Sequence, residues 1–130
     1  MTRIQIIRTV AWVDFAITLP FALPYVSHWV IGLLYHIDMQ LGLASPIPGF
    51  DPVSLMFVNI MGVLGVIWAM ARIGSPSAYL ARLDGLGRLV VAALIIHAIT
   101  WGATPLLWLF VATELAGSAA QLIRWPAKAQ

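Results

Sequence analysis

Apolar residues form four long runs along this chain, and charged or turn-forming residues separate the runs. The runs cover residues 9–34, 52–72, 86–101 and 105–123. A membrane-spanning helix needs roughly 20 mostly apolar residues, and only the third run falls clearly short of that length. The pattern therefore predicts an all-α, integral membrane four-helix bundle in which residues 1–130 form a single transmembrane domain.

Capping residues at the start of the second and third helices support these boundaries. Asp51 followed by Pro52 is typical of an N-cap with proline at the first helical position. Ser75 and Pro76 have the same form, and they predict a short surface helix that continues through Asp84 before the third span begins.

The connections between the runs differ in length. Residues 35–51 form a long outer loop between the first two helices, and we expect a short interfacial helix there, followed by a rigid proline-containing strap. The segment from Gly102 to Pro105 predicts a tight turn, with the proline starting the last helix. Pro20 and Pro24 lie inside the first run, so we expect a kink in that span.

The composition indicates that most of the protein's surface faces lipid. The chain is 62% hydrophobic and only 9% charged, whereas soluble domains are about 25% charged. A domain of 130 residues keeps too much of its surface exposed to hide this excess in a core. With no cysteine in the chain, disulfides and thiolate metal sites are excluded.

The basic residues predict the orientation in the membrane. With four spans all of them fall on one side, while the opposite loops carry Asp38 and Asp51 and no lysine or arginine. By the positive-inside rule both termini are cytoplasmic, in a multi-pass protein of the bacterial inner membrane. Because this charge is an orientation signal, we expect no nucleic-acid partner. The basic residues are Arg3, Arg8, Arg72, Arg82, Arg88, Arg124 and Lys128.

Each apolar run brings one strongly polar side chain into the inner or central part of the membrane, and these four are the candidate binding or proton-carrying residues. At 1.5 Å per residue from the basic residue at the inner boundary of each run, they lie ~9, ~20, ~14 and ~15 Å into the membrane. A carboxylate exposed to lipid at such depth costs at least ~2.5 kcal/mol, so we expect these side chains to point inward and meet. The four are Asp14, Asn59, His97 and Glu114, the last counted from Arg124.

The sequence leaves two roles open for Glu114. It is either a neutral acid that bonds His97 or Asn59 and joins helices, or a proton carrier or ligand anchor, the usual role of an ionisable residue in a membrane. Helical spacing places Glu114, Gly117, Ser118 and Gln121 on one face of the last helix.

No cofactor or metal is expected, and the catalytic residues are unknown. His28 and His97 differ in height by ~16 Å, too far to hold one haem within a single bundle. No fixed-spacing metal motif, phosphate-binding loop or nucleophile motif is present. A cleaved signal peptide is the alternative for the first run, but Asp14 and the length of the run disfavour it.

The layout, with a long outer loop after the first helix and a tight outer hairpin between the last two, resembles that of DoxX-like small four-helix bacterial membrane proteins. That resemblance implies a role with membrane redox complexes. The leading hypothesis is an accessory subunit or a binding bundle with a polar midplane pocket. The alternatives are a proton-coupled small transporter using Glu114, and a membrane enzyme that acts on a lipid-soluble substrate with Glu114 and His97. Beyond the lipid bilayer, the expected partners are a larger membrane complex or further copies of the chain.

Overall fold

The computed structural model describes residues 1–123, and its regular secondary structure is helical. Four segments are long and apolar enough to cross a membrane: α1, α3, α4, and the stretch from Pro105 to Leu122. The prediction of an all-α fold with four membrane-length helices is confirmed. The helices are α1 (Arg3–Ala22), α2 (Val26–Gln40), α3 (Pro52–Gly74), α4 (Ala78–Thr100) and α5 (Trp108–Leu122), with a 3-10 turn η1 (Pro105–Leu107) before α5.

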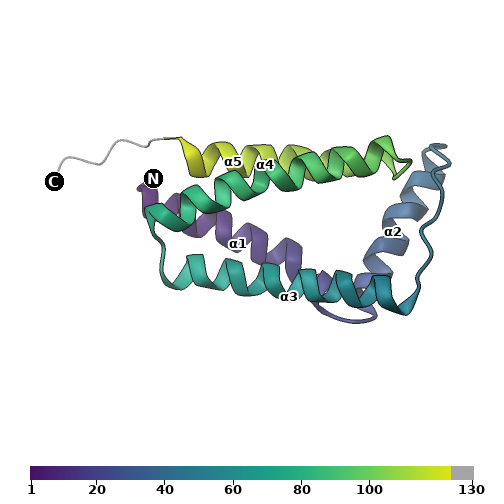
Figure 1. Cartoon of the computed structure of the whole chain (residues 1–130), viewed down its shortest axis with the longest axis horizontal. Helices are drawn as coiled ribbons and strands as arrows, with labels where there is room; N and C mark the ends of the chain where they lie inside the picture. The colour runs from purple at the N-terminus through teal and green to yellow at the C-terminus, as the bar shows by residue number, and fades with distance from the viewer. Residues whose placement is uncertain (124–130) are drawn as a thin grey trace.

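The four long helices form two pairs. Helix α1 packs along α3, and α4 packs along α5 (Figure 1). The start of α1, the α3–α4 connection and the end of α5 lie at one end of the molecule, which we call the basic end after Arg3, Arg8 and Arg82. Helix α2 lies at the opposite end, which we call the acidic end after Asp38 and Asp51.

The first apolar run is two helices rather than one kinked span. Helix α1 ends at Ala22 and α2 begins at Val26, with Tyr25 between them at a positive φ of 54°. Pro24 has no N–H to continue the α1 hydrogen-bond ladder, so the chain breaks here and turns. Helix α2 then runs across the acidic end toward the other helix pair (Figure 1). The expected span 9–34 is therefore corrected to residues 3–22, and α2 is an additional helix.

Helix α4 is continuous over Ala78–Thr100, so the short surface helix expected through Asp84 does not exist as a separate element. Its N-cap is Ser77, whose hydroxyl accepts a hydrogen bond from the Leu80 amide at 3.1 Å. The third span, expected at 86–101, thus begins earlier and has full membrane length.

Other local predictions are confirmed. Asp51 caps α3, accepting hydrogen bonds from the Val53 and Ser54 amides at 3.0 Å. Gly102 adopts φ 99° in the tight turn, and Pro105 opens the last helical segment. Residues 43–50, where we expect the strap, have no regular structure and run along the acidic end (Figure 1).

Glycines set the distance between α1 and α3. A Cβ atom added to Gly62 would lie 2.2 Å from the Ala22 backbone nitrogen, and one added to Gly65 would lie 2.8 Å from the Thr18 methyl. Only glycine permits this approach of two helices, as in other small-residue packing between membrane helices.

Candidate functional site

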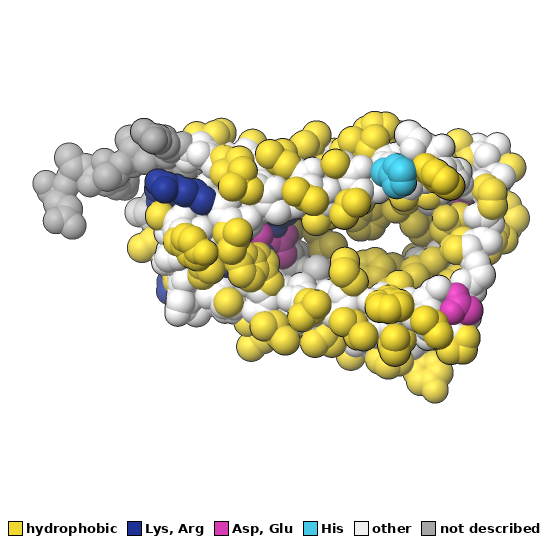
Figure 2. All heavy atoms as spheres, viewed as in Figure 1, with side chains coloured by type: hydrophobic (Ala, Val, Ile, Leu, Met, Phe, Trp, Pro, Cys, Tyr) yellow, Lys and Arg dark blue, Asp and Glu magenta, His cyan; other side chains and the backbone are white. Residues whose placement is uncertain are grey.

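Five charged side chains from the four long helices converge between the two helix pairs, and we call them the charge cluster. Figure 2 shows acidic side chains inside the hollow that separates the pairs. The cluster lies nearer the basic end than the acidic end, and it joins the two pairs through ion pairs. Its members are Asp14 of α1, Arg72 of α3, Asp84 and Arg88 of α4, and Glu114 of α5.

Asp84 is the acid with the most partners. Its carboxylate accepts from Arg72 Nη1 at 2.8 Å, from Arg88 Nε at 2.9 Å and from the Trp68 indole N–H at 2.8 Å. Arg88 is one helical turn beyond Asp84, a spacing at which side chains on one helix face meet. Because Arg72 belongs to α3, these bonds also tie α3 to α4.

Asp14 and Glu114 are bonded less completely. Asp14 Oδ2 accepts from Arg72 Nη2 at 2.5 Å and from Arg88 Nη2, and Glu114 Oε2 accepts from Arg88 Nη1 at 3.2 Å. Within residues 1–123, Asp14 Oδ1 and Glu114 Oε1 receive no hydrogen bond. The side chains of these two acids are 15% and 24% exposed, against 1% for Arg72. Asp14 and Glu114, rather than the arginines or Asp84, are therefore the most accessible part of the cluster.

The cluster contains three acids and two arginines, so it carries one net negative charge when every group is ionised. Ionised groups persist inside a membrane when they are paired or face a water-filled cavity. Removing one partner of a buried pair costs about 3–5 kcal/mol because the other charge is left uncompensated. The cluster is therefore tightly interdependent, and its two most exposed members, Asp14 and Glu114, are both acids.

Small residues of α5 make room for the cluster. A Cβ atom added to Gly117 would lie 2.5 Å from Arg88 Nη1, so the guanidinium occupies the space where a side chain would be. One residue later, the Ser118 hydroxyl donates to the Gly85 carbonyl at 2.8 Å. The polar face that begins at Glu114 thus packs against α4, as its helical spacing indicates.

A cavity of about 770 Å³ lies between the helix pairs, with the charge cluster in its wall. The hollow is visible in Figure 2, bordered largely by hydrophobic side chains. Its size is within the range of about 300–1,000 Å³ found for small-molecule sites, as is its combination of apolar walls with few polar groups. Besides the cluster, its lining includes Met61, Leu64, Val91, Phe110, Thr113 and Ala116.

His97 is not part of this site. Its side chain is exposed and its ring lies 5.6 Å from that of Trp101. The expected pairing of Glu114 with His97 is therefore wrong. Nine residues separate Arg88 from His97, and at 100° per residue they point to opposite sides of α4. Arg88, not His97, is the α4 residue that faces Glu114.

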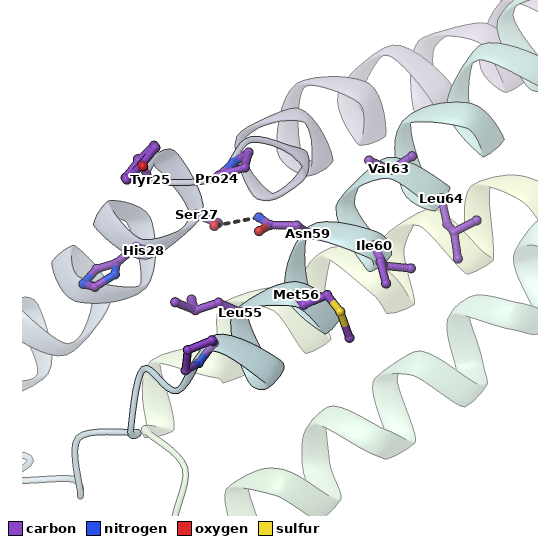
Figure 3. Close-up of a pocket in the computed structure, with 11 residues that line it drawn as sticks. Pro24, Tyr25, Ser27, His28, Leu55, Met56, Asn59, Ile60, Val63 and Leu64 are labelled. Atoms are coloured by element: carbon purple, nitrogen blue, oxygen red, sulfur yellow. Dashed lines mark hydrogen bonds between the residues drawn. The ribbon is translucent and has the colours of Figure 1, made fainter.

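Asn59 belongs to a second cavity of about 560 Å³, beside the break between α1 and α2. Its amide nitrogen donates to the Phe21 carbonyl and to the Ser27 hydroxyl, both at 2.9 Å, and Figure 3 shows Asn59 and Ser27 pointing toward one another. The Phe21 carbonyl is one of the last of α1 and has no helical partner, so Asn59 satisfies it. Nearby, His28 stacks on Phe50 with ring centroids 4.2 Å apart. Asn59 therefore stabilises the helix break.

A third polar group, which we call the acidic-end latch, consists of Asp38, Ser45 and Thr104. Asp38 accepts from the Ser45 amide at 2.9 Å, from the Ser45 hydroxyl at 2.6 Å and from the Thr104 hydroxyl. Burial raises the pKa of Asp38, but these hydrogen bonds together hold it below its ordinary value. The latch connects α2 to the strap and to the turn between α4 and α5.

Sequence reasoning missed most of the cluster. It treated Arg72 and Arg88 as markers of the membrane boundary, and it placed Asp84 in a surface helix. Arg88 is ten residues into α4, ~15 Å from its start, well inside the span. The spacing of Asp84 and Arg88, an acid and a base four residues apart within one long apolar helix, is the signal that could have revealed the pair.

The depth of Glu114 was counted from Arg124, which lies outside the described residues, as does Lys128. Measured instead from Leu122, where α5 ends, Glu114 is eight residues, or ~12 Å, into the helix. Glu114 and Asp14 both bind Arg88, whereas Asn59 and His97 lie elsewhere.

Comparison with known proteins gives no family assignment: no family model, curated protein or solved structure matches this chain. Within residues 1–123 no three His, Asp or Glu side chains are grouped to hold a metal ion. What the protein does is therefore inferred from the charge cluster and its cavity.

Proposed function

We propose that this protein is a small binding protein of the bacterial inner membrane. Its cavity receives a lipid-soluble ligand whose polar end lies against the charge cluster. The observation that carries the proposal is the position of Asp14 and Glu114 in the wall of a largely apolar cavity, each with one carboxylate oxygen that accepts no hydrogen bond within residues 1–123. An accessory subunit of a larger membrane complex, or a homo-oligomer, is the setting that the DoxX-like layout favours.

A purely structural role does not explain this arrangement well. A cluster that served only to join helices would be most stable with equal numbers of acids and bases, all buried and fully bonded. Here the acids outnumber the arginines, and of the five cluster residues, all of which line the cavity, Asp14 and Glu114 are the most exposed. An uncompensated charge in a membrane is costly unless something neutralises it.

The orientation proposed for the bundle places the basic end in the cytoplasm and the acidic end outside. Arg3, Arg8 and Arg82 support it through the positive-inside rule, and Asp38 and Asp51 lie at the other end. Arg72 and Arg88 do not contribute, because both are buried in the cluster.

Proton-coupled transport is the second candidate, and one observation favours it. Among the described residues, Glu114 has a single ionic partner, Arg88, and protonation of this one acid would make the cluster electrically neutral. A proton could then be exchanged for a ligand during a transport cycle. The third reading, an enzyme using Glu114 with His97, has no such support because the two side chains are not in contact.

A fluorescent probe tests whether the cavity binds. N-phenyl-1-naphthylamine is neutral, lipid-soluble and brighter in apolar surroundings. We expect saturable binding to the protein in mild detergent, and an affinity at least about tenfold lower for Ala116→Phe, because the new ring would fill the cavity that Ala116 lines.

Ala112→Phe is the matched control. Ala112 is also exposed and lies one turn earlier on α5, but it is not part of the cavity lining. It should bind the probe as the unmodified protein does. Equal binding by both variants, or no saturable binding by the unmodified protein, would contradict the proposed function.

A further inference from the structure

The cavity wall presents hydrogen-bond acceptors that lack donors. Asp14 Oδ1 and Glu114 Oε1 receive no hydrogen bond within the part of the chain that the structure describes. Both carboxylates bind the same Arg88 guanidinium, so they lie close to one another. A ligand that donates hydrogen bonds would find two charged acceptors at one place.

Several donors that line the same cavity are already engaged. The Thr18 hydroxyl donates to the Asp14 carbonyl at 2.8 Å, and the Thr113 hydroxyl donates to the Phe110 carbonyl at 2.8 Å. The Trp68 indole N–H donates to Asp84. Arg72 Nε has no hydrogen-bond partner among the described residues, but that side chain is only 1% exposed. The polar groups most accessible to a ligand are therefore the carboxylates of Asp14 and Glu114, which accept hydrogen bonds.

The net charge of the cluster also favours a particular kind of ligand. With all its groups ionised the cluster carries one excess negative charge, and Arg72 and Arg88 are more buried than Asp14 and Glu114. A ligand with one positive charge would neutralise the cluster, whereas an anion would add a second uncompensated charge in a medium of low dielectric constant.

We propose that the ligand of this cavity is a lipophilic amine, bound as its ammonium ion. The N–H groups of the ammonium donate to Glu114 and Asp14, and its apolar body lies between the helix pairs. This inference rests on the proposed function and specifies its ligand class. Charge-assisted hydrogen bonds are about twice as strong as neutral ones, so an N–H-bearing cation should be preferred to a cation without N–H groups.

Four ligands that share a naphthalene ring separate charge from hydrogen bonding. They are 1-naphthylmethylamine, its N,N,N-trimethyl derivative, 1-naphthylmethanol and 1-naphthylacetate, each measured by displacement of N-phenyl-1-naphthylamine at pH 7. The amine should bind most tightly, at least about tenfold more tightly than the acetate, since the interaction with the carboxylates changes sign. The trimethyl derivative should lie between the amine and the alcohol.

Glu114→Gln tests the residue assigned to the ammonium. It keeps the side-chain size and removes the excess charge, so the amine and the alcohol should then bind with affinities that differ by less than about threefold. Asp51→Asn is the matched control, because it makes the same charge change at the acidic end and asparagine still caps a helix. It should retain the full preference.

The outcomes are distinct. Equal affinities for the amine, alcohol and acetate in the unmodified protein would overturn the amine assignment, while probe binding would still support the cavity. A trimethyl derivative that binds as tightly as the amine would overturn the requirement for N–H donors. A preference that survives in Glu114→Gln would overturn the role of that residue. If this variant does not fold, the ranking of the four ligands on the unmodified protein decides.

Discussion

Substituting Gly117 with alanine should destabilise the bundle although it adds a single methyl group. In the folded protein that methyl would lie 2.5 Å from Arg88 Nη1, 2.8 Å from Cζ and 3.0 Å from Nε. The guanidinium has little freedom to move away, because Asp14, Asp84 and Glu114 all bind it. Either its ion pairs lengthen or α5 shifts away from α4.

The size of the effect follows from the pairs that are disturbed. Loss of one partner from a buried ion pair costs about 3–5 kcal/mol, and displacing Arg88 weakens its pairs without removing them. Alanine has a higher helix propensity than glycine, which returns up to about 1 kcal/mol. We therefore expect Gly117→Ala to lower the free energy of unfolding by about 2 kcal/mol, measured by titration with a denaturing detergent in mixed micelles.

Gly87→Ala provides the comparison. Gly87 is also inside a membrane-length helix and lines the same cavity, but nothing lies within 4 Å of a Cβ atom placed there. This variant should be as stable as the unmodified protein or slightly more stable. If Gly117→Ala and Gly87→Ala have the same stability, Arg88 does not occupy the position on which the charge cluster depends.

Three further predictions concern other parts of the fold. Asp38 has a lowered pKa, so its stabilising effect is complete above the ordinary carboxyl pKa. That effect is lost as the pH falls through the lower pKa of the folded state, below about pH 4. Asp38→Asn should therefore make the free energy of unfolding less dependent on pH in this range, and an unchanged dependence would argue against the latch. Gly62→Ala should lower the free energy of unfolding by about 1–3 kcal/mol, because the new methyl group would overlap the α1 backbone. Gly32→Ala should not lower it, because nothing lies within 4 Å of a Cβ atom there, and equal unfolding free energies for the two variants would refute the close contact. Reporter fusions after residue 75 should indicate the cytoplasm and fusions after residue 45 the outside, and the reverse pattern would overturn the orientation.

The helices that follow strong local signals could be predicted from the sequence. Helix α3 begins at the proline after its Asp51 cap, and Gly102 and Pro105 mark the turn before α5. These features depend on residues adjacent in the chain, and the free energies that determine them are local. The polar face of α5 was also predictable, because helical periodicity fixes which residues share a side.

The partners of that face could not be predicted in the same way. In the sequence, Arg72 and Arg88 resemble the basic residues that flank membrane spans. Only the packing of four helices shows that they point inward to Asp14 and Asp84. The prolines indicate where the first run breaks. The direction of the chain after the break depends on the hydrogen bonds from Asn59 to the end of α1 and the start of α2. Both features arise from contacts between residues far apart in the sequence.

Methionine methyl groups offer the most direct test of the central claim, that a ligand binds in the cavity beside the charge cluster. Met61 lines that cavity, Met56 lines the second cavity at the helix break, and Met70 of α3 lines neither. With ¹³C-methyl-methionine protein in nanodiscs and bound N-phenyl-1-naphthylamine, intermolecular NOEs should connect the naphthyl protons to Met61. NOEs to Met56 or Met70 without Met61, or none to any methionine, would contradict the account.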